Sequence, residues 1–115
     1  MRNRLARLGL FFLLGWGMAT VTRVMPAAKK GLQVYFVDVE GGQATMFVTP
    51  EGKSLLIDAG WPGNNNRDAN RIALAAKDAL ISKIDFVLIT HYHDDHVGGS
   101  TQLAAKIPEI GRAHV

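Results

Sequence analysis

The chain has 115 residues, no cysteine and a formal net charge of +3. Without cysteine, disulfides, cysteine-bound zinc, a thiol nucleophile and a lipoprotein anchor are all excluded. Four arginines and no acidic residue lie in the first 28 residues, so the rest of the chain carries 9 basic and 10 acidic side chains. The positive charge therefore belongs to the N-terminus and gives no reason to predict a nucleic-acid-binding surface.

The N-terminal segment has the pattern of an export signal. Residues 1–7 contain three arginines, and residues 8–21 form an uncharged and mostly apolar run of 14 residues. A transmembrane helix needs about 20 apolar residues, whereas the core of a signal peptide is shorter. We therefore predict a signal peptide over residues 1–28 and a periplasmic or extracellular protein, with an uncleaved N-terminal anchor as the alternative. We predict no other membrane contact.

Three strands are predicted at the start of the mature chain. Residues 31–39 place apolar side chains on both alternating faces, which predicts a strand buried on both sides. Residues 43–49 and 54–58 predict the second and third strands. The glycine pair at residues 41–42 predicts a turn, because glycine accepts a positive φ. The order of these segments predicts an antiparallel meander.

A helix is predicted over residues 67–82. Its apolar residues fall at spacings of three and four and form one stripe: Ala69, Ile72, Ala73, Ala76, Ala79 and Leu80. Asp68 lies off the stripe, where it can pair with Arg71. The asparagines at residues 64–66 are candidates for the N-cap.

A fourth strand is predicted over residues 83–90, because residues 86–89 are continuously apolar. A short final helix is predicted over about residues 100–106. The glycines at residues 98–99 precede it, and we expect the helix start to present N–H groups to an anionic substrate.

The chemically active side chains gather after the fourth strand. Residues 90–99 have the sequence T-H-Y-H-D-D-H-V-G-G, with three imidazoles and two carboxylates. Imidazole and carboxylate ligands suit zinc, and also iron or manganese. A loop at a strand end can aim His91 and His93 to one side, and Asp95 and His96 at a second point. A solvated His-rich loop or a single core histidine does not explain this spacing, so we predict a site for two metal ions.

The same loop resembles the H-x-H-x-D-H motif of the metallo-β-lactamase superfamily. Residues 54–60 (S-L-L-I-D-A-G) resemble the strand-end aspartate motif of that superfamily, and the two motifs occur in the right order. Residues 34–48 resemble the extracytoplasmic branch related to competence proteins, although Gln43 and Ala44 stand where that branch carries an aspartate. The resemblance covers about residues 32–108.

The resemblance implies an α+β fold, the four-layer αββα sandwich built from two βα halves. Residues 29–108 would be the N-terminal part of that domain, with its antiparallel strands, helix, strand, metal loop (residues 90–99) and short helix. The remaining ligands of the superfamily lie in the second half, so we expect this chain alone to bind metal weakly and to be inactive. We also expect it to expose one face of its sheet.

The resemblance also implies the roles of the site residues. His91 and His93 would bind the first ion, and Asp95 and His96 the second. Asp58 would brace the metal loop without binding metal, the plainer interpretation being an aspartate that forms a turn. Asp95 and Asp58 are therefore the candidate catalytic carboxylates. Diiron relatives have a glutamate in place of His93, which favours Zn²⁺ here and leaves manganese and iron open.

The reaction implied is hydrolysis by a metal-bound hydroxide. The competence-like opening fits a phosphodiester substrate, and export fits a lactone, an amide or another small ester-like molecule. Two alternatives are a non-catalytic extracytoplasmic binding domain on the same fold and a diiron redox protein. The oligomeric state stays open.

The last seven residues have an unusual property. Residues 109–115 (E-I-G-R-A-H-V) reverse-translate to a DNA sequence that matches a sequencing-library adapter from its second base onward. We predict that this segment is an adapter-derived artefact, so His114 is not used as a ligand.

Overall fold

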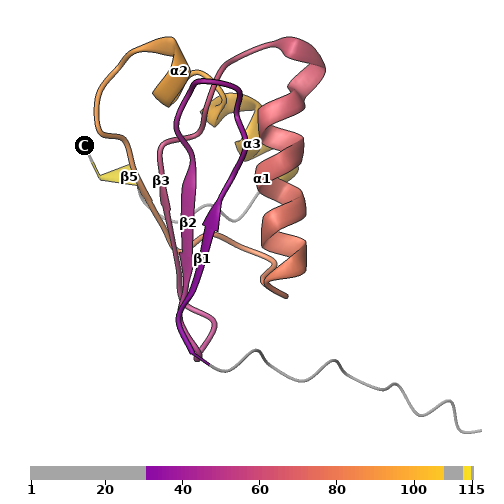
Figure 1. Cartoon of the computed structure of the whole chain (residues 1–115), viewed down its shortest axis with the longest axis vertical. Coiled ribbons are helices and arrows are strands. Elements are labelled where there is room, and N and C mark those ends of the chain that lie inside the picture. Colours follow the sequence, from indigo (N-terminus) through magenta and orange to yellow (C-terminus); the bar gives the residue numbers. More distant parts are fainter. Residues whose placement is uncertain (1–30, 108–112, 115) are drawn as a thin grey trace, which may run out of the picture.

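The computed structural model describes residues 31–107 and 113–114, and it contains one mixed sheet (Figure 1). The strands follow one another across the sheet in chain order: β1 (Gln33–Phe36), β2 (Thr45–Val48), β3 (Ser54–Ile57), β4 (Phe86–Leu88) and β5 (Ala113–His114). The pairs β1–β2 and β2–β3 are antiparallel, which confirms the predicted meander, and β3–β4 and β4–β5 are parallel. The predicted signal peptide lies outside the described residues.

The helices lie in the second part of the chain. Helix α1 (Arg67–Asp78) connects the parallel strands β3 and β4, since parallel neighbours need a crossover. A single turn of helix, α2 (Asp94–Val97), lies inside the predicted metal loop, and α3 (Ser100–Lys106) matches the predicted final helix. No helix in the described part of the chain combines the length and apolarity that crossing a bilayer requires.

The hydrophobic core fills the space between the sheet and helices α1 and α3. Met46, Leu56 and Val87 point into it from three neighbouring strands, and Ile72 and Leu103 meet them from the two helices. The alanines of α1 keep its stripe shallow, so the helix lies close to the sheet. Alternate residues of the first four strands thus face this core.

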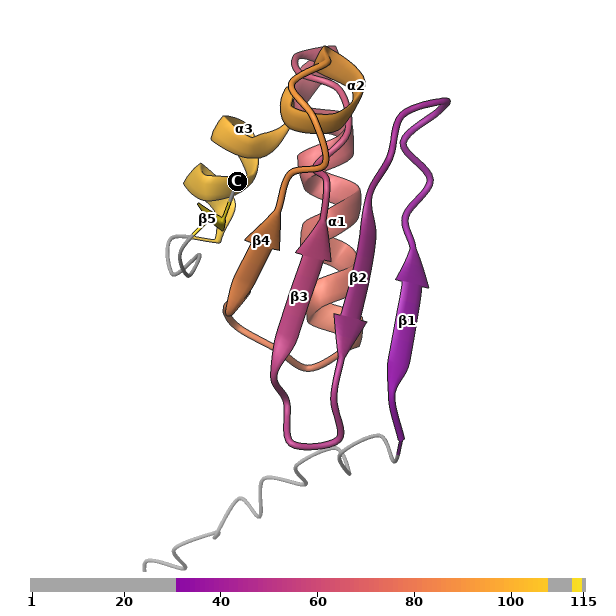
Figure 2. The same ribbon diagram turned by 90° about the vertical axis from the view of Figure 1, so that its left-hand side faces the viewer.

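The opposite face of the sheet is exposed. The register aligns Val34 with Phe47, Phe47 with Leu55 and Leu55 with Phe86, so these four side chains share that face. Figure 2 views the sheet from this side, with α1 behind it. The prediction that residues 31–39 are buried on both sides is therefore wrong in this chain, where Phe36 is 84% exposed. The expectation that one sheet face would be exposed is confirmed.

Helix α1 ends earlier than predicted. Its last residue is Asp78, and Leu80 has a φ of 61° and is 51% exposed, so Leu80 does not belong to the buried stripe. The asparagines before the helix form a 3-10 turn, η1 (Asn64–Asn66), and all three have positive φ. Their side chains do not cap the helix, contrary to the prediction. Asparagine suits these positions because it tolerates the left-handed backbone conformation.

Asp68 was predicted to lie off the buried stripe and to pair with Arg71, and the structure corrects this. Its side chain is buried, with its carboxylate 2.6 Å from Nε of Arg67 and accepting the Trp61 N–H at 2.8 Å. Arg71 instead reaches the β1–β2 turn, where Nη1 lies 3.2 Å from the Asp38 carboxylate. The pair predicted within the helix is thus replaced by contacts that hold two loops against its first turn.

Strand β5 falls inside the segment predicted to be adapter-derived. Its backbone pairs with β4 at Val87–Ala113 and Leu88–His114. The origin of residues 109–115 stays a prediction.

Candidate metal centre

Two adjacent parallel strands position the site. Asp58 directly follows β3. Thr90 and His91 follow β4, and the carboxyl ends of parallel neighbours meet at one edge of a sheet. Figure 2 shows α2 above these strand ends, beside the start of α1.

Three of the four predicted ligands converge at this edge. His91, Asp95 and His96 each offer a ligand atom, and these atoms lie within 4.8 Å of one another. His93 lies outside that group, but its ring stacks edge-on against His91 with 4.8 Å between centroids. Two imidazoles and a carboxylate, partly open to solvent, are a donor set that fits zinc. The cluster draws from both predicted ligand pairs, so their division between two ions stays a prediction.

Asp58 braces this cluster from the neighbouring strand. One carboxylate oxygen accepts the Thr90 backbone N–H at 2.8 Å, and the other accepts the Thr90 hydroxyl at 2.7 Å. Nδ1 of His96 lies 2.7 Å from that second oxygen, which makes Nδ1 the protonated nitrogen. In the neutral imidazole, Nε2 then carries the lone pair, on the side where Asp95 lies at 3.5 Å.

The environment of Asp58 keeps its carboxyl ionised. Burial raises the pKa of Asp58, but the hydrogen bonds from the Thr90 backbone, His96 and the Thr90 hydroxyl outweigh it, so the pKa is lowered from 3.8. The residue also has a φ of 59°, in the left-handed region that aspartate tolerates. Turn formation and bracing, weighed as alternatives from the sequence, thus coincide in one residue.

Backbone hydrogen bonds fix the metal loop to the two loops beside it. The Ala59 N–H donates to the His96 carbonyl at 2.7 Å, and the Gln43 N–H donates to the Asp95 carbonyl at 3.0 Å. Sequence reasoning missed these contacts, because backbone groups leave no signature in residue type. It also missed Thr90, whose hydroxyl between a strand end and the first histidine was an available signal.

The expected anion site at the start of the last helix does not include the N–H groups of its two glycines. The Gly99 N–H donates to the Gly60 carbonyl at 3.0 Å, and the Gly98 N–H donates to the Asp94 carbonyl at the same distance. Both amides are therefore occupied within the protein.

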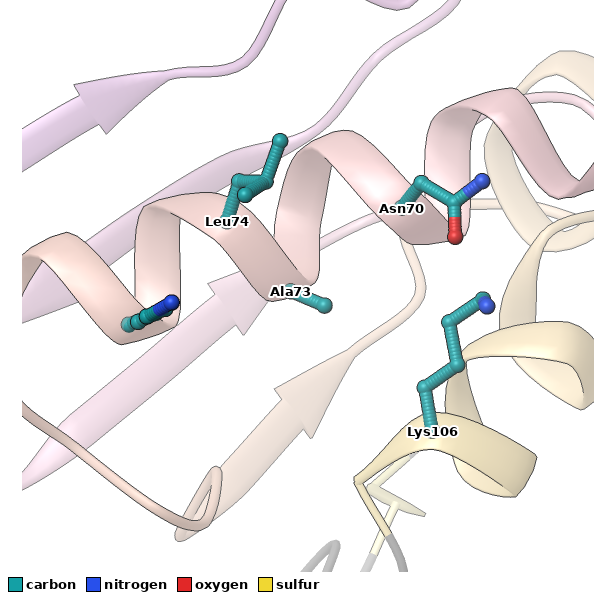
Figure 3. A pocket seen from close by; sticks show the side chains of 5 residues that line it. Asn70, Ala73, Leu74 and Lys106 are labelled. Carbon is teal, nitrogen blue, oxygen red and sulfur yellow. The ribbon is translucent and has the colours of Figure 1, made fainter.

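A separate hollow lies between α1 and α3. It is lined by Asn70, Ala73, Leu74, Lys77 and Lys106, the last approaching from α3 (Figure 3). None of the predicted metal ligands lines it, so it is distinct from the cluster at the strand ends.

The sequence profile of the metallo-beta-lactamase superfamily matches residues 38–115, a stretch that holds both motifs and the whole cluster. The chain belongs to the metallo-β-lactamase superfamily. Its resemblance to that superfamily, inferred from the two motifs, is thereby confirmed, together with an α+β fold.

Several curated relatives of this superfamily member are hydrolases by name. A UPF0173 metal-dependent hydrolase of Koribacter versatilis is 37% identical over 61% of this chain and 30% of its own length. A protein of the same name from Caldivirga maquilingensis is 40% identical over 56% of this chain and 25% of its own. The hydroxyacylglutathione hydrolase of Stenotrophomonas maltophilia is 32% identical over 56% of this chain and 22% of its own length. The chain thus spans less than a third of each of these proteins.

Solved structures show the same fold. The metallo-β-lactamase of Cronobacter sakazakii with a HARLDQ motif aligns with a TM-score of 0.54 and 24% identity. The alignment covers 75% of this chain and 34% of that one. The likeness supports the arrangement of sheet and helices.

Proposed function

We propose that this chain is the metal-binding part of a metal-dependent hydrolase, and that His91, His93, Asp95 and His96 are its metal ligands. The observation that carries the proposal is the convergence of His91, Asp95 and His96, whose ligand atoms lie within 4.8 Å. The names of the relatives support the hydrolase assignment.

We propose zinc as the metal, since imidazole and carboxylate ligands suit it. A bound zinc ion would polarise a substrate carbonyl or phosphoryl group and lower the pKa of a water molecule. The contribution of the chain itself is to present these ligands in fixed orientations. Asp58 holds the tautomer of His96, while His91 is exposed and Asp95 half-buried, so substrate can reach them from solvent.

We propose two classes of substrate, which differ in the bond that is hydrolysed. A phosphodiester and a small lactone, amide or ester are the two classes, and both are opened by attack of an activated water on an electrophilic centre. Two ions in the complete site and export from the cytoplasm complete the proposal; both are supported by sequence alone.

Zinc binding tests the proposal directly. Equilibrium dialysis of the 115-residue chain against zinc, up to millimolar, should show binding, and His91→Ala or Asp95→Ala should weaken it by at least about tenfold. Tyr92→Phe is the matched control, because Tyr92 lies between the ligands and is 68% exposed. No zinc binding by the wild-type chain, or equal binding by all variants, would refute the metal site.

Activity is a second test. We expect a longer gene product to hydrolyse bis(p-nitrophenyl) phosphate or a chromogenic lactone, and His91→Ala to abolish turnover. The 115-residue chain alone should be inactive. Turnover by the short chain that is lost on chelation would contradict this last expectation.

A further inference from the structure

The β1–β2 turn contacts the backbone of the metal loop. The Gln43 N–H donates to the Asp95 carbonyl, and the Gln43 carbonyl accepts the Gly60 N–H at 2.9 Å. One residue of the turn therefore joins the backbone of a proposed metal ligand to the loop after β3.

Gly42 lies at the closest point of this contact. A Cβ atom at Gly42 would lie 2.6 Å from the carbonyl oxygen of Asp95 and 3.1 Å from the indole of Trp61. Carbon and oxygen atoms that are not bonded do not approach to 2.6 Å, and the backbone of Asp95 cannot rotate away as a flexible side chain would.

The need for glycine here is one of space. Gly42 is not among the glycines with positive φ, whereas its neighbour Gly41 has a φ of 87°. A Cβ atom at Gly41 would have nothing within 4 Å. The two glycines of one turn thus serve different purposes: the first supplies a left-handed backbone, and the second supplies room for Asp95.

The turn is also held from its other side. Nη1 of Arg67 lies 2.6 Å from the Glu40 carboxylate, and Nη1 of Arg71 lies 3.1 Å from the other oxygen of the same carboxylate. The buried carboxylate of Asp68 holds Arg67 in place, 2.6 Å from its Nε. Because these contacts anchor the turn to α1, added bulk at Gly42 would displace the metal loop rather than the turn.

We propose that Gly42 is a positioning residue for the metal site. By carrying no side chain, it lets the anchored turn sit against Asp95 and sets where the Asp95 carboxylate lies relative to His91 and His96. The inference rests on the proposed metal-binding function.

Cobalt titration of the 115-residue chain tests this role, with visible absorption reporting ligand geometry. In Gly42→Ala, we expect Co²⁺ affinity to fall by about 10- to 100-fold and the absorption bands to shift, as when the support of a ligand is altered. Gly41→Ala is the matched control: it strains the same turn without a contact, so it should lower the melting temperature and keep the wild-type spectrum.

The outcomes separate the role of Gly42 from the function itself. No Co²⁺ binding by the wild-type chain would refute the metal site. Binding by the wild type, with an unchanged affinity and spectrum in Gly42→Ala, would overturn only the role of Gly42, as would equal weakening in Gly41→Ala. If Gly42→Ala does not fold, the double variant Glu40→Gln/Gly42→Ala weakens the two Glu40 ion pairs and gives the turn some room to relax. Arg71 still contacts Asp38 and Arg67 still contacts the Val39 carbonyl, so the turn stays against Asp95. A shifted spectrum in that variant supports the proposal, and a wild-type spectrum overturns it.

Discussion

The buried residue Asp58 has several structural roles. It accepts two hydrogen bonds from Thr90 and one from His96, and it adopts a left-handed backbone at the end of β3. Its ionised carboxylate is what makes Nδ1 of His96 the protonated nitrogen. The hydrogen bonding of His96, a proposed metal ligand, therefore depends on a residue that does not belong to the metal loop.

Asp58→Asn tests this dependence. An amide N–H facing Nδ1 would favour the proton on Nε2 of His96 and remove the lone pair that we propose binds the metal. We expect zinc affinity to fall by about 10- to 100-fold, measured by competition with a chromogenic chelator. Glu51→Gln, on the exposed turn between β2 and β3, is the control. An Asp58→Asn chain with wild-type affinity would show that Asp58 only forms the turn.

At the scale of elements, close backbone approaches hold α2 and α3 on the loop after β3. A Cβ atom at Gly99 would lie 2.1 Å from the carbonyl oxygen of Ala59, although Gly99 has an ordinary helical φ of −75°. The metal loop therefore rests on this loop through contacts that admit no side chain.

Gly99→Ala should consequently destabilise the chain by overpacking, by about 1–3 kcal/mol. In a domain of this size each kcal/mol lowers the melting temperature by roughly 4–8 °C, which circular dichroism resolves. Ser100→Ala is the control at the next residue. Its Oγ is buried and has no hydrogen-bond partner within the described part of the chain, so its removal should not destabilise. Equal melting temperatures for Gly99→Ala and the wild type would contradict the close contact.

The start of β3 is joined to the start of β4 through Asp85. Its carboxylate accepts the Ser54 N–H at 3.0 Å, and the Ser54 hydroxyl accepts the Asp85 N–H at 3.0 Å. Burial raises the pKa of Asp85, but the Ser54 N–H and the nearby ammonium groups of Lys83 and Lys53 outweigh it and hold the pKa below 3.8.

A lowered folded-state pKa fixes the sign of the pH dependence. The contribution of Asp85 to stability is present above pH 3.8, the value of the unfolded chain, and is lost as pH falls through the lower folded value. We expect Asp85→Asn to lower the free energy of unfolding in urea at pH 7 by about 1–2 kcal/mol. The variant should also lose less stability than the wild type between pH 5 and pH 3. The same loss in both chains would rule out this role.

The elements and the site were predictable to different degrees. The position of the metal loop after β4 followed from an apolar run and a histidine cluster, both of which are local patterns. The bracing of His96 by Asp58 was implied only by resemblance, and the support of Asp95 by Gln43 was not predicted, because contacts between distant backbone groups carry no local pattern. Asp68 was misplaced because helical periodicity does not reveal a loop folded over the first turn.

At the scale of the whole molecule, the uncovered sheet face dominates the behaviour expected in solution. Phe36 is 84% exposed, Phe86 51% and Val34 41%, and all three lie on the face opposite α1. Contiguous exposed apolar surface of this kind mediates association. Burial on both faces was predicted for residues 31–39 because the pattern describes a complete sandwich, whereas the described part of the chain supplies one layer of helices.

Self-association should follow and should depend on this face. Size-exclusion chromatography with light scattering should show concentration-dependent oligomers of the wild-type chain. Phe36→Lys, which places a charge on an edge strand, should shift the population toward monomer. Leu74→Lys is the control, because Leu74 is 63% exposed on α1, away from the sheet face. A monomeric wild type, or an equal effect of both lysines, would contradict the expectation.

The hydrogen bond between Asp58 and His96 joins residues 38 positions apart, and α1 lies between them. This contact cannot form until β4 has aligned beside β3, and pairing strands that are distant in sequence is slow compared with forming a helix. Cation capture during refolding would consequently report the completion of this pairing. A stopped-flow experiment with a zinc indicator should record it as a late phase, after the helical signal has developed.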